Sequence, residues 1–92
     1  MNKAIKLTIH GKVQGVGYRR WFEQQALGLG LKGYVRNLAS GDVEAVLLGC
    51  EDAVLDLVNR SFSGPLHANV TAVEQMELNA DQCSYTDFKL VR

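Results

Sequence analysis

Hydrophobic and polar residues alternate one by one near the start of the chain. Ile5, Leu7 and Ile9 are separated by single polar residues, and the alternation runs to His10. Successive side chains of a strand point to opposite sides, so this pattern predicts a strand with one buried face and one face toward solvent. A glycine-rich stretch follows directly. It ends the strand, because glycine adopts positive φ angles at no steric cost.

The residues after the glycine-rich stretch have helical spacing. Phe22, Ala26 and Leu29 recur at intervals of four and three residues, and Tyr18 extends the same stripe by one turn. This spacing predicts an amphipathic helix that begins between Tyr18 and Trp21 and ends near Leu29, where glycines supply the stop signal. We interpret Trp21 and Phe22 as packing residues rather than as residues that stack on a ligand.

The middle of the chain predicts a hairpin and a second helix. Strands are expected over Leu31–Leu38 and Val43–Leu48, and the short polar turn between them makes the pair antiparallel. Glu51 and Asp52 then open a helix, since early carboxylates suit the positive end of the helix dipole. The glycine and proline of residues 63–65 end it. The apolar face of this helix is expected to comprise Val54, Leu57, Val58 and Phe62.

The last third of the chain predicts two further strands. Asn69 to Leu78 has the length and composition of a strand, and its imperfect alternation around residues 72–74 indicates a bulge. Residues 79–84 are polar and predict a loop. A short final strand is expected over Tyr85–Val91.

The element order is therefore β-α-β-β-α-β with a terminal strand added. Two helices on one face of an antiparallel sheet would bury both apolar helix stripes against the apolar strand faces. This solution is an α+β fold, a ferredoxin-like two-layer sandwich. We predict that residues 1–92 form a single domain of this kind.

Charge adds one feature to this picture. Ten Lys and Arg balance ten Asp and Glu, and a neutral chain is poorly suited to bind nucleic acid through its phosphate backbone. We therefore expect no nucleic-acid partner. The first 46 residues nevertheless hold seven of the ten cations, which suits a small anionic ligand bound by that half of the chain.

The sequence also indicates a cellular compartment. No apolar run approaches the roughly 18 residues that span a bilayer, and residues 1–6 carry charge where a signal peptide needs an apolar core. We expect a cytoplasmic protein, without a membrane partner and monomeric. In that setting Cys50 and Cys83, which lack metal-binding spacing, are expected to be reduced thiols rather than a disulfide.

The stretch from Gly11 to Arg19 has the features of an anion-binding loop. It carries three glycines and two cations, and it lies between a predicted strand and a predicted helix. Backbone N–H groups of such a loop can turn inward toward an anion beside a helix N-terminus. Arg19 stands at the exit of the loop, where its planar guanidinium can hold a phosphate or carboxylate at two points.

The chemistry missing from this stretch restricts the reaction. No Asp or Glu lies between Gly11 and Phe22, and the stretch lacks the Gly-Lys-Ser/Thr ending of a nucleotide-binding loop. His10 and His67 have no partner spacing for a metal site or a nucleophile–base pair, and we interpret both as surface residues. An acyl phosphate suits such a site, because its carboxylate leaving group needs no proton and positioning alone remains to be done.

Asn37 is a second candidate, near the end of the second predicted strand. The alternation places it on the side of Val35, so we expect a buried or half-buried amide. A neutral amide both donates and accepts hydrogen bonds and can orient a water molecule. An asparagine that closes the hairpin through local hydrogen bonds is an equally good interpretation of the residues alone.

The stretch Gly11–Arg19 resembles the G-x-V-Q-G-V-x-[FY]-R signature of the acylphosphatases and matches it at every fixed position. Gly33–Asn37 is also similar to that family. The resemblance implies a metal-free hydrolase without a cofactor that cleaves acyl phosphates to a carboxylate and inorganic phosphate. It implies that Arg19 binds the phosphate and that Asn37 positions the attacking water. The expected phosphate-binding residues are Gln14, Gly15, Val16, Gly17, Tyr18 and Arg19.

Two other functions compete with hydrolysis. The same element order occurs in RNA-binding modules, and Lys32–Val35 is similar to part of their aromatic motif, although on the second strand instead of the third. An anion-sensing regulatory domain would bind phosphate without turnover.

We do not extend the resemblance to Arg20, since adjacent helical side chains point about 100° apart. It either raises the local positive potential or, as we favour, lies in solvent.

Overall fold

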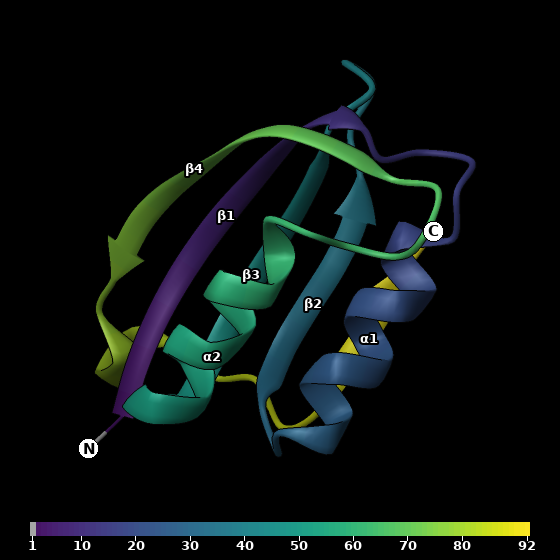
Figure 1. The fold of residues 1–92 in the computed structure, drawn as a ribbon. Helices are drawn as coiled ribbons and strands as arrows, with labels where there is room; N and C mark the ends of the chain where they lie inside the picture. The colour runs from purple at the N-terminus through teal and green to yellow at the C-terminus, as the bar shows by residue number, and fades with distance from the viewer. Residues whose placement is uncertain (1) are drawn as a thin grey trace.

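A computed structural model describes residues 2–92 of the chain as two layers, a sheet and a pair of helices (Figure 1). The strands and helices are β1 (Asn2–Lys12), α1 (Tyr18–Gly28), β2 (Lys32–Asn37), β3 (Val43–Cys50), α2 (Glu51–Ser61), β4 (Asn69–Leu78), the 3-10 helix η1 (Ala80–Gln82) and β5 (Phe88–Val91). Both long helices lie on one face of the sheet. The α+β, ferredoxin-like prediction is confirmed.

The sheet has the strand order β4-β1-β3-β2-β5. β1 pairs antiparallel with β3 and β4, and β2 and β3 form the predicted antiparallel hairpin. The last pair differs from the expected antiparallel sheet, because β5 runs parallel to β2. Residues 79–87 carry the chain from the β4 edge to the opposite edge, so β5 enters alongside β2 in the same direction (Figure 1).

The core lies between the sheet and the two helices. Most of the predicted inward residues of β1, α1 and α2 are buried: Ile5, Leu7, Ile9, Tyr18, Phe22, Ala26, Val54, Leu57 and Val58. Leu29, expected on the α1 stripe, follows the last residue of the helix and is half-buried against the core. Phe62 was expected in this set but is 49% exposed. α2 ends at Ser61, so Phe62 leaves the helical stripe. Ser61 is buried in its place, and its hydroxyl donates to the Val58 carbonyl at 2.6 Å.

Several boundaries differ from the sequence predictions. β1 extends beyond both predicted ends, to Asn2 and Lys12. The final strand begins at Phe88 rather than Tyr85, and the polar loop before it contains η1. The irregularity of β4 is real and lies next to the expected place. His10 pairs with Ala72 while the following residue pairs with Val70, so the shift occurs one residue before residues 72–74.

Gly33 in β2 has a backbone conformation that other residues rarely adopt. Its φ is 133°, and an added Cβ atom would lie 1.9 Å from the carbonyl oxygen of Val46. We expect Gly33→Ala to lower the free energy of unfolding by at least about 2 kcal/mol, because both the strained φ and the opposite strand oppose the methyl group. Urea unfolding measures the loss.

Gly28 offers a matched control for this substitution. An added Cβ atom there meets nothing within 4 Å. Gly28→Ala should leave the free energy of unfolding unchanged or raise it by up to about 1 kcal/mol, since alanine restricts the unfolded chain. Equal losses of stability in the two variants would contradict the role assigned to Gly33.

Candidate active site

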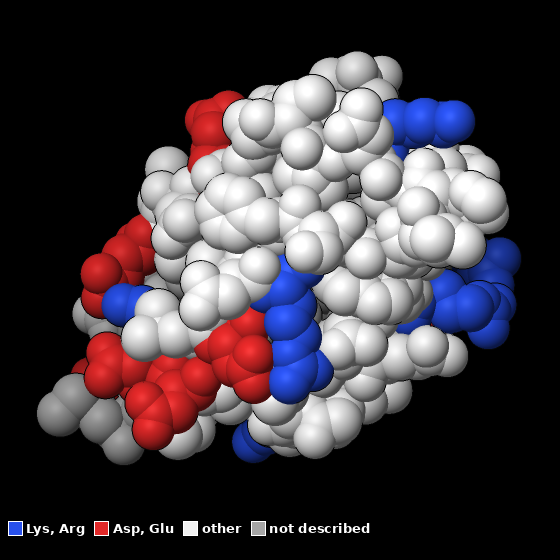
Figure 2. All heavy atoms as spheres, viewed as in Figure 1, with Lys and Arg blue, Asp and Glu red and all other residues white. Residues whose placement is uncertain are grey.

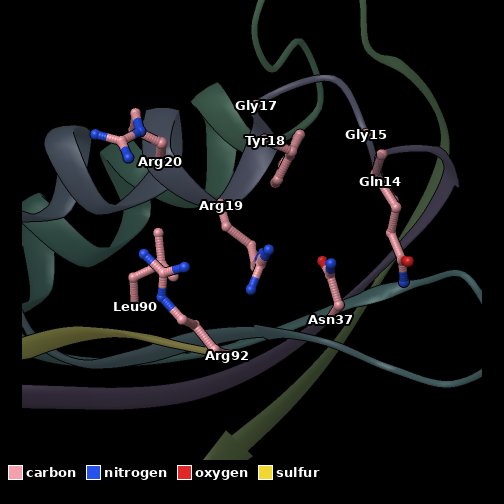
Figure 3. A pocket seen from close by; sticks show the side chains of 10 residues that line it. Gln14, Gly15, Gly17, Tyr18, Arg19, Arg20, Asn37, Leu90 and Arg92 are labelled. Carbon is pink, nitrogen blue, oxygen red and sulfur yellow. The ribbon is translucent and has the colours of Figure 1, made fainter.

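A hollow of about 220 Å³ opens at the N-terminal end of α1. Its walls come from the loop after β1, the first turn of α1, the end of β2 and the end of β5 (Figure 3). The residues that line it are Val13, Gln14, Gly15, Gly17, Tyr18, Arg19, Arg20, Asn37, Leu90 and Arg92. The fold therefore brings Arg19 and Asn37, which the sequence singled out separately, to one place.

The loop between β1 and α1 presents its backbone to this hollow. Gly15 and Gly17 have φ values of 74° and 78°, which turn the chain back on itself before the helix. Within the described part of the chain, the N–H groups of residues 15–18 donate no hydrogen bond. α1 also begins without a side-chain cap and without an acidic residue in its first turn. The positive end of the helix dipole is therefore left to attract an anion.

Arg19 reaches into the hollow from the first turn of α1 (Figure 3). The side chain is half-buried, and its Nη1 donates to the carbonyl oxygen of Val91 in β5 at 3.1 Å. Among residues 2–92 it makes no ion pair with a carboxylate. β5 thus orients the guanidinium and leaves most of its N–H donors available for a ligand.

Asn37 is the last residue of β2, and its side chain points toward that of Arg19 (Figure 3). It shares the side of buried Val35 but is itself exposed, because β2 ends there at the mouth of the hollow. The expected burial was wrong. Within residues 2–92 its amide makes no hydrogen bond, and backbone bonds close the hairpin instead, with Leu38 N–H donating to Asp42 at 2.8 Å. The hairpin-closing interpretation of Asn37 therefore finds no support.

Three of the predicted phosphate-binding residues have side chains engaged elsewhere. Gln14 donates two hydrogen bonds to backbone carbonyls of the β2–β3 turn. Tyr18 is buried, and its hydroxyl donates to the Ser61 carbonyl at 2.7 Å; burial raises the pKa of this phenol. Val16 packs against the core and does not line the hollow. Only the backbone N–H groups of these residues are free to meet a phosphate.

Two further cations border the hollow. Arg20 is exposed, and its side chain extends away from that of Arg19 (Figure 3), as the helical geometry predicted. Arg92 was not identified from the sequence. It enters because β5 pairs beside β2, a contact between distant parts of the chain that no local pattern signals. Figure 2 shows Lys and Arg side chains gathered on the side where α1 begins, while acidic side chains gather around the start of α2.

Glu44, the buried carboxylate of β3, does not line this hollow. Glu44 is buried on the sheet face opposite the helices, where it accepts hydrogen bonds from Tyr34 at 2.8 Å and Arg36 at 2.9 Å. Burial alone would raise the pKa of Glu44, but these two bonds hold it below the ordinary value. Burial, together with the hydrogen bond to Glu44, raises the pKa of Tyr34 to about 12. Among residues 2–92, no acidic side chain lines the hollow, and no group of three or more His, Cys, Asp or Glu could hold a metal ion.

His10 lies on the same open face of the sheet, between two carboxylates. Its Nδ1 is 3.0 Å from Asp42 Oδ1, and its Nε2 contacts Glu74. His10 lies at the surface, as the sequence predicted, but its two carboxylate contacts were not foreseen. The hydrogen bond to Glu74 raises the pKa of the imidazole most, partial burial opposes it, and Asp42 raises it further.

This raised pKa predicts a pH-dependent stability. A cation favoured in the folded state stabilises the protein fully below the unfolded pKa of about 6.5 and loses that effect as the pH rises through the folded pKa. We expect wild type to exceed His10→Asn in free energy of unfolding at low pH, with the difference shrinking as the pH rises above about 6.5. Urea unfolding of both proteins across this range measures it, and two parallel curves would contradict it.

An uncompensated helix N-terminus, a glycine loop and a guanidinium, set on a two-layer α+β sandwich, are features suited to binding an anion such as phosphate. The comparisons with known proteins specify the class. The family model that matches is Acylphosphatase, over residues 5–90. This chain belongs to the acylphosphatase family, and it is a hydrolase of acyl phosphates.

Individual relatives agree with this assignment. An acylphosphatase of Azorhizobium caulinodans is 47% identical over 75 residues, which cover 82% of this chain and 81% of the relative. An acylphosphatase of Methanothrix thermoacetophila is 40% identical over 91 residues, 99% of each chain. The solved structure of an acylphosphatase from Coxiella burnetii is 37% identical, has a TM-score of 0.92, and is matched over 98% of this chain and 93% of that chain.

Proposed function

We propose that this acylphosphatase binds the phosphoryl group of its substrate in the hollow at the start of α1. The backbone N–H groups of residues 14–18 and the guanidinium of Arg19 hold the phosphoryl oxygens. Asn37 orients the attacking water. The observation that carries this proposal is that Arg19 and Asn37 point into one hollow from opposite walls, with no acidic side chain of residues 2–92 among its lining (Figure 3).

The residues suit a displacement that needs no general acid. The water oxygen forms a bond to phosphorus while the bond from phosphorus to the acyl oxygen breaks, and the acyl group leaves as a carboxylate. The water proton passes to phosphate or solvent. Arg19 and the loop N–H groups stabilise the charge on the equatorial oxygens, and the Asn37 carbonyl accepts a hydrogen bond from the water. The products are the carboxylate and inorganic phosphate.

We further propose a cytoplasmic monomer of one domain that works without metal, cofactor or nucleic acid. Cys50 and Cys83 are free thiols, which suits a reducing compartment. No helix in residues 2–92 has the length and apolar character needed to cross a membrane.

Hydrolysis of benzoyl phosphate in the presence of a chelator tests the proposal. We expect full activity and competitive inhibition by inorganic phosphate, because phosphate occupies the site that holds the phosphoryl group. Single-stranded RNA should cause no mobility shift at physiological salt. Activity lost to the chelator, inhibition by phosphate that is not competitive, or phosphate binding without turnover would refute the mechanism.

A further inference from the structure

We propose that Gln14 is a positioning residue, whose side chain sets the separation between the phosphate-binding loop and Asn37. This role rests on the proposed function. It differs from the direct phosphate contact that the sequence suggested for Gln14, because the side-chain amide is already engaged by other groups.

The amide of Gln14 bridges two parts of the site. Its Nε2 donates to the carbonyl oxygen of Leu38 and to that of Asp42, each at 2.9 Å. These carbonyls stand at the two ends of the turn between β2 and β3, and Leu38 directly follows Asn37. Both N–H bonds of one half-buried amide are thus used to tie the loop to the hairpin that carries Asn37 (Figure 3).

The turn that Gln14 holds is itself well anchored. Leu38 N–H donates to the Asp42 carbonyl at 2.8 Å, and Gly41 N–H donates back to the Leu38 carbonyl at 3.2 Å. The Asp42 carboxylate accepts from the hydroxyl of Ser40 at 2.9 Å and lies 3.0 Å from Nδ1 of His10. Because the turn keeps these bonds without Gln14, removal of the amide should release the loop and leave the hairpin in place.

The loop and Asn37 perform different parts of the reaction. Residues 14–18 carry the N–H groups that hold phosphate, whereas Asn37 holds the water that must approach in line with the leaving group. The loop lies between β1 and α1, whereas Asn37 ends β2, and β1 and β2 are not paired directly because β3 lies between them in the sheet. The two bonds of Gln14 therefore fix the distance from phosphorus to water, where a displacement of about 1 Å can cost about 100-fold in rate.

Gln14→Met tests this role, because methionine has a similar length and no donor. We expect kcat for benzoyl phosphate to fall by about 10- to 100-fold while the inhibition constant of inorganic phosphate changes by less than about threefold. Gln14→Ala should show the same division between kcat and phosphate binding, and it serves if the methionine variant does not fold. Ser40→Ala is the matched control, since it removes a bond within the same turn but none to the loop, and its kcat should stay within about twofold.

A double-mutant cycle with Asn37→Ala separates positioning from general stability. If Gln14 acts through Asn37, Gln14→Met should lower kcat by less than about twofold in the Asn37→Ala background, after spontaneous hydrolysis is subtracted. Losses that multiply in the double variant, or an equal loss of phosphate binding, would overturn the positioning role. Wild-type protein that does not hydrolyse benzoyl phosphate would instead refute the proposed function itself, and the positioning role with it.

Discussion

Arg19→Ala is expected to lower kcat/KM for benzoyl phosphate by about 10³- to 10⁵-fold, the range typical of a guanidinium on a transferring phosphoryl group. Arg19 enters the hollow with no ion pair among residues 2–92 and with its orientation set by the Val91 carbonyl. Its charge is therefore not neutralised before substrate binds. Arg19→Lys should recover little of the loss, because an ammonium cannot hold two oxygens in the planar geometry of a guanidinium.

Arg20→Ala is the matched control for this experiment. It removes the same charge one residue away, from a side chain that extends away from Arg19 (Figure 3). Its kcat/KM should stay within about threefold of wild type, because an exposed charge is largely screened by salt. Folded Arg19→Ala protein with wild-type activity, or an Arg20→Ala loss as large as that of Arg19→Ala, would contradict the assignment.

Asn37→Ala is expected to lower kcat by about 10²- to 10³-fold and to leave the inhibition constant of inorganic phosphate nearly unchanged. The expected division follows from its place: the exposed amide borders the hollow at the end of β2, opposite the loop that we propose holds the phosphate. Stability should change little, because the Asn37 amide makes no hydrogen bond within residues 2–92 and backbone bonds close the hairpin.

Asn37→Asp distinguishes the water-orienting role from simple occupancy of space. The carboxylate has nearly the same shape but repels the phosphoryl group, so it should weaken phosphate binding as well as turnover. If Asn37→Ala lost phosphate binding as strongly as it lost turnover, Asn37 would be a phosphate ligand instead. Steady-state kinetics with phosphate as inhibitor give both quantities for each variant.

Much of the fold could be predicted because its elements follow local patterns. Ile5, Leu7 and Ile9 alternate in the sequence and are buried together in β1, and the Tyr18–Ala26 stripe is buried in α1. The errors lie where a local pattern ends. Phe62 continues the apolar stripe of α2 in sequence only, since the helix stops one residue before it. Asn37 follows the side of Val35 but lies beyond the part of the sheet that the helices cover.

The residues of the candidate site also separate into those that the sequence could indicate and those that depend on contacts between distant parts of the chain. The loop, Arg19 and Asn37 could be proposed from residue type, spacing and resemblance. Arg92 could not, because it joins the hollow only through the parallel pairing of β2 with β5. The contacts of Gln14 were equally hidden. Its amide meets carbonyls 24 and 28 residues away. Every residue carries a backbone carbonyl, so no sequence pattern marks the two that the fold brings to Gln14.

The parallel β5 strand has a consequence for biosynthesis. Val91 orients the guanidinium of Arg19, and Leu90 and Arg92 complete the wall of the hollow. Residues 88–92 leave the ribosome after β1, β2, β3 and both helices, because they follow all of these elements in the chain. Until they dock, the hollow lacks one wall and the contact that orients its arginine. If Arg19 binds the phosphoryl group as proposed, enzymatic activity requires that β5 has docked, and not merely that the remainder of the sheet has formed.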